Sequence, residues 1–440
     1  MSHARRLHGP LAWIGAMSLL ATSLHAQATW KRDHDAGAKA AKAAQFTEAE
    51  TLLSKSADDV HSDKNLTPLR ARSLIDLGKV YRAEGKYDLA QPCYDEALQI
   101  VTKENGADSP EAAEVLNEEA ELYKILNDYD KAEPLLIKSL DIRQRKLPQP
   151  DLATAQTQND LGELYMATGA YDKAAPLLQA ALDTRKHLLG EGHEDVAQTL
   201  EAWGNLDKKM GKDVEAEGLF RQAVGIYGKT VGGEHPDYAN ALESLALYYS
   251  AREKYDLAEP LLERILEIRQ KVFGPDHHDV AVSLDALALI KLRQHQYAEA
   301  APLYVRALII WGKIYGQENP WLSADLGNLG LCYENVKDFG DAELTFRRAV
   351  RNDEKGLPLD SSDLAADSYN LGFLYYLTRH FQEADPLLKR ALDIQTKTLG
   401  LANPDTVQTA QTYANVLRLL HREQEAQQLE SKLKAAGPAQ

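Results

Sequence analysis

The sequence has few of the residues that stabilise small or strand-rich folds. Its 440 residues include only two cysteines, 27 glycines, 17 prolines and 7 phenylalanines, and no long run of Val, Ile and Thr that would indicate β-strands. Ala, Leu, Glu and Lys dominate instead, which is a helix-forming composition. Because a chain of this length is too long for one hydrophobic core, the composition favours a helical repeat array over several separate globular domains.

Motifs for catalysis and metal binding are also missing. The sequence contains no zinc-protease helix motif, phosphate-binding loop, zinc-finger cysteine spacing or nucleophile-elbow serine. Gly190-Glu191-Gly192 lacks both a preceding strand and the third glycine of a dinucleotide-binding loop, so it is interpreted as a turn. Cys93 and Cys332 each lie within a helical pattern and are expected to be small buried side chains without a mutual disulfide. We therefore predict no enzyme activity, no cofactor and no metal site.

The N-terminus has the layout of an export signal. Arg5 and Arg6 precede an apolar stretch, and small residues follow at Ala26 and Ala28. The apolar stretch is shorter than the roughly 20 residues that span a bilayer, and no later segment approaches that length. We expect a signal peptide at 1–26 and a periplasmic or secreted mature protein, with a retained membrane anchor as the alternative.

Acidic residues outnumber basic ones. The formal net charge is −16, and it becomes −18 if the predicted signal peptide, which contains two arginines and no acid, is removed. An acidic surface of this size disfavours nucleic acid and anionic membranes as partners.

A repeat of 42 residues organises the rest of the chain. A small residue recurs at this spacing, preceded once at a spacing of 41, and an alanine follows each small residue 12 positions later. Ten copies in register, with no insertion in the main array, predict ten structural repeats. The small residues are Gly37, Gly78, Ala120, Gly162, Gly204, Ala246, Ala288, Gly330, Gly372 and Ala414.

Each repeat contains two helical patterns. Around the small residue, apolar positions such as Leu74, Leu77 and Tyr81 recur at helical spacing and define helix A. An aromatic residue such as Tyr87 opens the second pattern, helix B. We expect the small residues where helix A crosses helix B, because a missing side chain lets the two backbones approach closely. A single hairpin cannot bury its apolar faces, so neighbouring repeats must stack on one another.

Histidines recur with the same period where the repeats join. His193, His235 and His277 are spaced by 42 residues. Equivalent positions in stacked helices lie roughly 10 Å apart, whereas the ligand atoms of one zinc ion lie about 2 Å from it. The three histidines are therefore expected to cap helices or lie in loops.

This pattern resembles the tetratricopeptide repeat. A small residue is followed by Tyr three positions later, Ala twelve later and an aromatic or Leu sixteen later, and the stretch 255–266 reads YDLAEPLLERIL, similar to the kinesin-light-chain subtype. The resemblance covers about 30–434 and leaves 435–440 as a tail. It implies an all-α, right-handed superhelical solenoid of about ten antiparallel helix-turn-helix hairpins, with the A helices lining a concave peptide groove.

One repeat departs from the pattern. At about 194–233, the residues Trp203, Asp207 and Asp213 stand where other repeats have Leu, Tyr and Tyr. Because two expected buried aromatics are lost, we expect this weak repeat to act as a hinge.

By analogy with the family, the residue after each small residue faces the groove, and this lining changes from charged to apolar near the middle of the array. One hypothesis is that a basic segment of a partner binds to the first, charged half of the array and an apolar segment to the second half. The alternative is that Leu is simply common at these positions in this type of repeat. The asparagines in the set either bond a peptide backbone or are solvated. The predicted binding residues are Asn117, Glu121, Asn159, Glu163, Asn205, Leu247, Leu289, Leu331, Asn328, Asn370 and Phe373.

The sequence thus predicts a non-catalytic scaffold that binds proteins or peptides and is exported to the periplasm or cell envelope. The alternatives are a self-associating structural protein, or an enzyme or carbohydrate-binding module built across repeats. A carbohydrate ligand would require aromatic pairs such as Trp311 and Trp321 on the groove.

Overall fold

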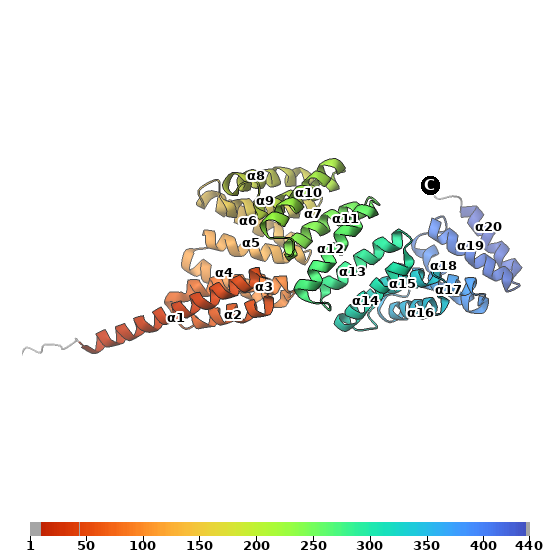
Figure 1. Cartoon of the computed structure of the whole chain (residues 1–440), viewed down its shortest axis with the longest axis horizontal. Coiled ribbons are helices and arrows are strands. Elements are labelled where there is room, and N and C mark those ends of the chain that lie inside the picture. Colours follow the sequence, from red (N-terminus) through yellow and green to blue (C-terminus); the bar gives the residue numbers. More distant parts are fainter. Residues whose placement is uncertain (1–9, 44, 437–440) are drawn as a thin grey trace, which may run out of the picture. The chain divides into compact units, whose positions relative to one another are not determined.

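The computed structural model describes residues 10–43 and 45–436, and these residues form twenty α-helices and two short 3-10 helices, with no β-strand among them. The all-α prediction is therefore confirmed (Figure 1). Arg5 and Arg6 of the predicted signal peptide, and residues 437–440 of the predicted tail, lie outside the described residues.

The chain divides into two compact units, one ending at Val231 and one beginning at Gly232. The helices of the N-terminal unit are α1 (Pro10–Lys42), α2 (Phe46–Asp59), η1 (Lys64–Leu66), α3 (Thr67–Ala83), α4 (Tyr87–Asn105), α5 (Pro110–Ile125), α6 (Tyr129–Lys146), α7 (Leu152–Ala167), α8 (Tyr171–Leu189), α9 (Glu194–Lys209) and α10 (Asp213–Thr230). Those of the C-terminal unit are α11 (Pro236–Ser250), α12 (Tyr255–Phe273), α13 (His278–Arg293), α14 (Tyr297–Tyr315), η2 (Pro320–Leu322), α15 (Ser323–Asn335), α16 (Phe339–Gly356), α17 (Ser362–Leu377), α18 (Phe381–Thr398), α19 (Pro404–Leu419) and α20 (Glu423–Ala436).

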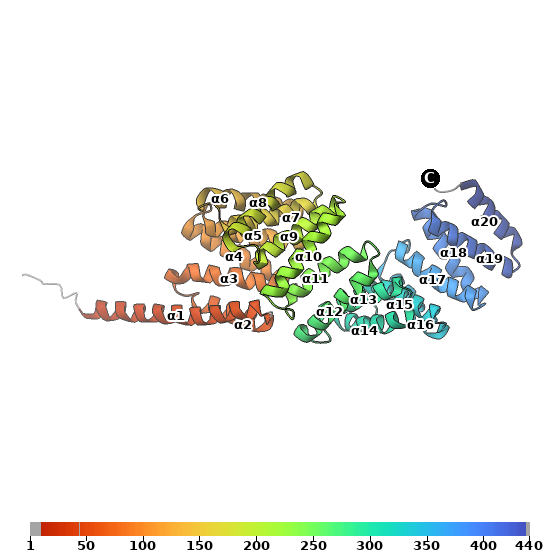
Figure 2. The same ribbon diagram turned by 45° about the horizontal axis from the view of Figure 1, so that its top comes forward.

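Consecutive helices pair as hairpins, from α1 with α2 to α19 with α20, which gives the ten hairpins predicted (Figure 2). Odd-numbered helices are helix A and even-numbered helices are helix B. From α6 onward each helix B begins 42 residues after the previous one, which confirms the repeat length. Within the N-terminal unit α3, α5, α7 and α9 contact one another in succession, as do α13, α15, α17 and α19 in the C-terminal unit. Among the described helices, successive B helices contact one another less than successive A helices do. Each stack therefore curves with its A helices on the inner side.

The small residues lie where helices A and B cross. A Cβ atom added to Gly78 would lie 2.6 Å from the ring of Tyr94, which is fully buried, and one added to Gly162 would lie 2.8 Å from Leu178. These distances are shorter than van der Waals contact, so a larger side chain would force the packed side chain of helix B to move.

We expect Gly78→Leu to lower the free energy of unfolding of the N-terminal unit by about 2 kcal/mol, because overlap with Tyr94 outweighs the better helix propensity of leucine. Urea denaturation followed by circular dichroism measures the loss. Gly218→Leu in α10 is the matched control, since a Cβ there meets nothing within 4 Å. Equal losses in the two variants would contradict this explanation.

Helix starts use the capping chemistry that the sequence indicated. The Ser109 hydroxyl accepts a hydrogen bond from the backbone N–H of Ala112 at 3.1 Å, with Pro110 at the first helical position. His193, His235 and His277 each accept a bond at Nδ1 from the backbone N–H two residues later, at 3.1–3.2 Å. The capping role of the three histidines is confirmed, and no group of metal-ligating side chains occurs in the part of the chain described.

The two cysteines are free and buried in different units, as expected. Cys93 lies in α4 and Cys332 in α15. Burial raises the pKa of both thiols to about 11, so neither is ionised at neutral pH.

The N-terminal helix α1 continues without interruption past Ala26 and Ala28, where cleavage is expected. No helix among the described residues combines the length and the apolar character needed to cross a membrane. The signal peptide stays a prediction.

The boundary between the two compact units falls at the end of the weak repeat, which consists of α9 and α10. Helix α10 begins at Asp213 and buries only Ala216, Phe220 and Ala223. Helix α18, four repeats later, buries six side chains, five of them apolar. The weak repeat therefore has less apolar surface holding its second helix in place.

Backbone amides in the middle of α10 are expected to exchange with deuterium at least about tenfold faster than those of α18, because local opening of α10 breaks fewer buried contacts. Hydrogen exchange read by mass spectrometry compares the two helices in one sample. Equal protection would argue against the hinge prediction.

Candidate functional site

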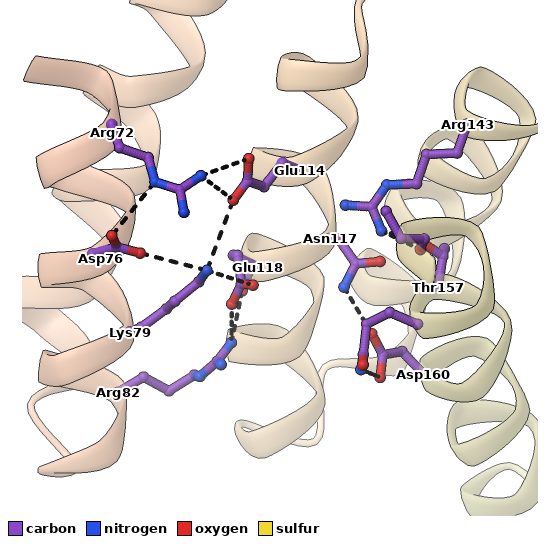
Figure 3. Close-up of polar contacts among 12 residues, drawn as sticks. Arg72, Asp76, Lys79, Arg82, Glu114, Asn117, Glu118, Arg143, Thr157 and Asp160 are labelled. Atoms are coloured by element: carbon purple, nitrogen blue, oxygen red, sulfur yellow. Dashed lines mark hydrogen bonds and ion pairs between the residues drawn. The ribbon is translucent and has the colours of Figure 1, made fainter. Parts of the chain in front are cut away.

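The side chains that the A helices turn away from the B helices form what we call the A-helix face. In α3 and α5 this face is a network of three basic and three acidic residues (Figure 3). Lys79 Nζ lies 3.3 Å from Glu118 and 3.6 Å from Asp76, and Arg82 lies 3.0 Å from Glu118. Arg72 bonds Glu114 at 3.2 Å, so every charge in the network has an opposite partner. Burial disfavours the charged form of Lys79, but the surrounding carboxylates outweigh it and raise its pKa.

The next part of the face is centred on a lysine. Lys124 Nζ bonds Glu121 at 2.7 Å and Glu163 at 3.0 Å, which joins α5 to α7. Burial lowers the pKa of Lys124, but Glu163 and Glu121 more than offset this and raise it above its ordinary value. Burial, reinforced by the charge of Asp160, raises the pKa of Glu121 to about 8. Both predicted binding residues Glu121 and Glu163 are therefore engaged within the protein.

The predicted asparagines of the N-terminal unit are also engaged. Asn117 Nδ2 donates to Asp160 at 2.7 Å, and Asn159 Nδ2 donates to Glu163 at 2.8 Å (Figure 3 shows the first). Both asparagines are buried, and their Oδ1 atoms have no hydrogen-bond partner. Asn205, on α9, is half-buried. The charged half of the face thus satisfies most of its polar groups internally.

The C-terminal unit presents a different face. Leu247 is 53% exposed and Leu289 is 37% exposed, while Leu331 and Phe373 are half-buried. These four residues, which we call the apolar row, occupy the same position of α11, α13, α15 and α17. Their helices α13, α15 and α17 contact one another in succession, so the row is continuous from Leu289 to Phe373.

Aromatic side chains extend the row at α17. The ring of Phe373 stacks on that of Tyr369, with centroids 5.8 Å apart and planes inclined by 17°, and Tyr376 lies 6.1 Å away on its other side. Asn328 and Asn370 lie one turn before Leu331 and Phe373 on the same helices, and both are half-buried. Neither amide is hydrogen-bonded to any of the described residues. The structure thus brings the predicted residues Leu289, Leu331, Phe373, Asn328 and Asn370 together.

Three acids beside the apolar row were not among the predicted binding residues. Asp285, Asp325 and Glu334 lie on α13 and α15, and none of them is paired with a basic side chain in the described part of the chain. Trp311 Nε1 donates to Asp285 Oδ2 at 2.6 Å. Burial, and then the neighbouring Asp325, raise the pKa of Asp285 to about 8, while burial raises the pKa of Asp325 to about 6.

The aromatic pair considered for a carbohydrate is not on this face. Trp311 stacks on Tyr315 at 5.7 Å and Tyr315 meets Trp321 edge-on at 5.5 Å, so the three rings form one cluster. They belong to helix B α14 and to η2 rather than to an A helix, and Trp321 is 75% exposed. The carbohydrate alternative would require such a pair on the A-helix face, and the structure places these tryptophans elsewhere.

The family of the chain is decided by its match to a family model, the tetratricopeptide repeat, at residues 69–145, 153–229, 204–271, 237–308, 286–355 and 364–433. The chain is a tetratricopeptide repeat protein. This confirms the resemblance noted in the sequence, and the repeat scaffold of this family is suited to binding proteins. No curated protein matches the sequence.

Solved structures of tetratricopeptide repeat proteins resemble this one. One is a signal transduction ATPase with numerous domains (STAND) from Pyrococcus horikoshii that has a tetratricopeptide repeat sensor. It is 15% identical over 81% of this chain and 53% of its own, and the TM-score of 0.60 shows a common fold. A putative kinesin light chain with nearly identical repeats from Podosopora anserina is 26% identical over 47% of this chain and 98% of its own, with a TM-score of 0.42. BtubC from P. vanneervenii is 22% identical over 52% of this chain and 91% of its own, with a TM-score of 0.46.

Proposed function

We propose that this tetratricopeptide repeat protein is a non-catalytic scaffold that binds a segment of a partner protein on the A-helix face of its C-terminal unit, in the periplasm or cell envelope. The observation that carries the proposal is the apolar row with two unbonded asparagine amides beside it. Burial of exposed leucine and aromatic surface supplies about 25 cal/mol per Å² of free energy. An asparagine amide offers both a donor and an acceptor to a peptide backbone.

The two halves of the face are unequal as binding surfaces. In the N-terminal unit a partner would have to displace contacts such as those of Lys124 with Glu121 and Glu163. The partner would then gain little, because the free energy of new contacts is offset by the loss of existing ones. This weakens the hypothesis that a basic segment binds to the N-terminal unit, and it favours the C-terminal unit for both segments.

Affinity capture tests the function. The mature protein is immobilised and incubated with the envelope fraction of its own cells, and retained proteins are identified by mass spectrometry. We expect a partner that is retained by the wild type and lost with Leu289→Asp combined with Phe373→Asp. Leu344→Asp is the matched control, because Leu344 is 70% exposed but lies on helix B α16. Retention of the same proteins by all three would overturn the proposal.

The self-associating alternative is separated by the same variants. If the apolar row joins copies of this chain, the mass in solution rises with concentration for the wild type and for Leu344→Asp, and stays that of a monomer for the double variant. A monomer at every concentration excludes that alternative.

Export is supported by Arg5 and Arg6, the apolar stretch and the small residues at Ala26 and Ala28. Cell fractionation and N-terminal sequencing of the recovered protein test it. A protein that retains Arg5 and is found in the cytoplasm would contradict export.

A further inference from the structure

The spacing of the apolar row, and the acids beside it that have no basic partner, indicate which kind of partner segment binds to the C-terminal unit. We propose that the C-terminal unit binds an extended segment with an apolar side chain at every third residue and lysine or arginine between them. The inference rests on the proposed function and narrows the partner to one class of sequence. Spacing and charge support it separately.

The spacing follows from the stacking of the A helices. Leu289, Leu331 and Phe373 hold the same position on helices that contact one another, and packed helices lie roughly 8 to 10 Å apart. An extended chain in the polyproline II conformation returns to the same face every three residues, after about 9 Å. A β-strand returns every two residues, after about 7 Å, and falls out of register by the third contact. A three-residue period therefore matches the row.

The charge follows from the acids that have no basic partner among the described residues. Asp285 lies one turn before Leu289 and Glu334 about one turn after Leu331, so carboxyl groups flank the row on both sides. Asp285 Oδ1 and Glu334 Oε2 are buried and accept no hydrogen bond. By contrast Glu243, beside Leu247, is held by Arg269 at 2.8 Å.

The unpaired acids therefore begin at α13, where the continuous part of the apolar row also begins. Burial raises the pKa of Asp285 and Glu334, and a lysine or arginine of the partner would supply the missing donors and lower that pKa, so that the carboxyl groups ionise as the cation binds. A partner with acidic residues at the same places would raise the pKa of these carboxyl groups further and would supply no donor. Charge complementarity thus selects lysine or arginine rather than glutamate between the apolar residues.

Fluorescence anisotropy with labelled synthetic peptides tests the inference on the full-length protein. The first peptide has leucine at every third position, lysine after each leucine, and proline or serine elsewhere. The second has the same residues with leucine at every second position, the third has the helical spacing of three and four, and the fourth replaces lysine by glutamate. We expect the first peptide to bind about tenfold or more tightly than each of the others.

Protein variants locate the binding. Leu289→Asp with Phe373→Asp is expected to weaken the first peptide about tenfold or more, and Leu344→Asp to leave it unchanged. Asp285→Asn with Glu334→Gln is expected to abolish the preference for lysine over glutamate. This pair of changes removes buried carboxyl groups and is not expected to impair folding, which circular dichroism checks.

Two results would overturn the inference and leave the proposed function standing. One is that the second or third peptide binds as tightly as the first or more tightly, and that this binding is lost in the variant with Leu289→Asp and Phe373→Asp. The other is no binding of any peptide by a protein whose captured partner still depends on Leu289 and Phe373. If partner capture also survives the double variant, both the inference and the proposed function fail.

Discussion

The Asp367→Asn variant is expected to be more stable than the wild type at pH 8 by about 3 to 5 kcal/mol, and to gain little at pH 4. Asp367 is 6% exposed and meets Asp353, which is fully buried and whose oxygens accept no hydrogen bond from a backbone amide or a basic side chain among the described residues. Burial, and then the charge of Asp353, raise the pKa of Asp367 to about 8. Two adjacent buried carboxyl groups are tolerated when they hold a proton between them.

The sign follows from proton binding. An acid with a higher pKa in the folded state holds its proton more tightly there, so its contribution to stability is complete below the unfolded value of 3.8 and is lost as the pH rises through about 8. Asp285, with a pKa raised to about 8, and Asp325, raised to about 6, act in the same direction. The free energy of unfolding of the C-terminal unit is therefore expected to fall between pH 4 and pH 8.

Urea denaturation at the two pH values measures the effect. Asp393→Asn is the control, because Asp393 is exposed on α18 and its replacement should change stability little at either pH. A gain from Asp367→Asn that is the same at pH 4 and pH 8 would contradict the explanation.

Arg185→Ala is expected to destabilise the N-terminal unit by about 3 to 4 kcal/mol, through a cavity and through polar groups left without a partner. Arg185 is 1% exposed, although it carries a charge. Its guanidinium donates to the backbone carbonyl of Asp195 at 2.8 Å, to the hydroxyl of Thr199 at 2.7 Å, and to the side chain of Gln156. It thereby ties α8 to α7 and α9.

Denaturation by urea compares this variant with Arg145→Ala. Arg145 lies on the surface, where its ion pairs with Asp108 and Asp141 are solvated, and its loss should lower stability much less than the loss of Arg185. If the two variants lose equal stability, burial of Arg185 is not the cause.

Much of the fold could be predicted because it depends on local spacing. Glycine and alanine at 42-residue intervals specify where helices cross, and Ser109 and His235 specify where helices begin. The contact of Lys124 with Glu163, by contrast, depends on the relative rotation of two helices in different repeats. Spacing in the sequence does not contain that rotation.

The buried polar contacts do have a signal that sequence reasoning missed. Arg143 bonds Thr157, Arg185 bonds Thr199 and Arg269 bonds Ser283, each over 14 residues from helix B to the next helix A. Asp353 and Asp367 have the same separation. Alignment of the repeats would therefore have shown that Asp353 and Asp367 replace the arginine and the hydroxyl residue of the other repeats, and would have predicted their contact.

The candidate site was predicted in part for the same reason. Leu289, Leu331 and Phe373 could be placed by register alone, since exposure follows from helix position. The engagement of Asn117 by Asp160, and the freedom of Asn328 and Asn370, depend on which side chains the neighbouring repeat supplies. The asparagines of the two units, which also differ by one position in the repeat, thus differ in availability.

Each of the two buried thiols can report the local opening of the unit that contains it. Cys93 and Cys332 are the only cysteines of the sequence, and each unit contains one. Since a buried, protonated thiol does not react, alkylation of either cysteine requires its surroundings to open first. Mass mapping of the alkylated peptides over time therefore gives two opening rates from one unmodified molecule, and shows whether a bound partner closes one unit while the other continues to open.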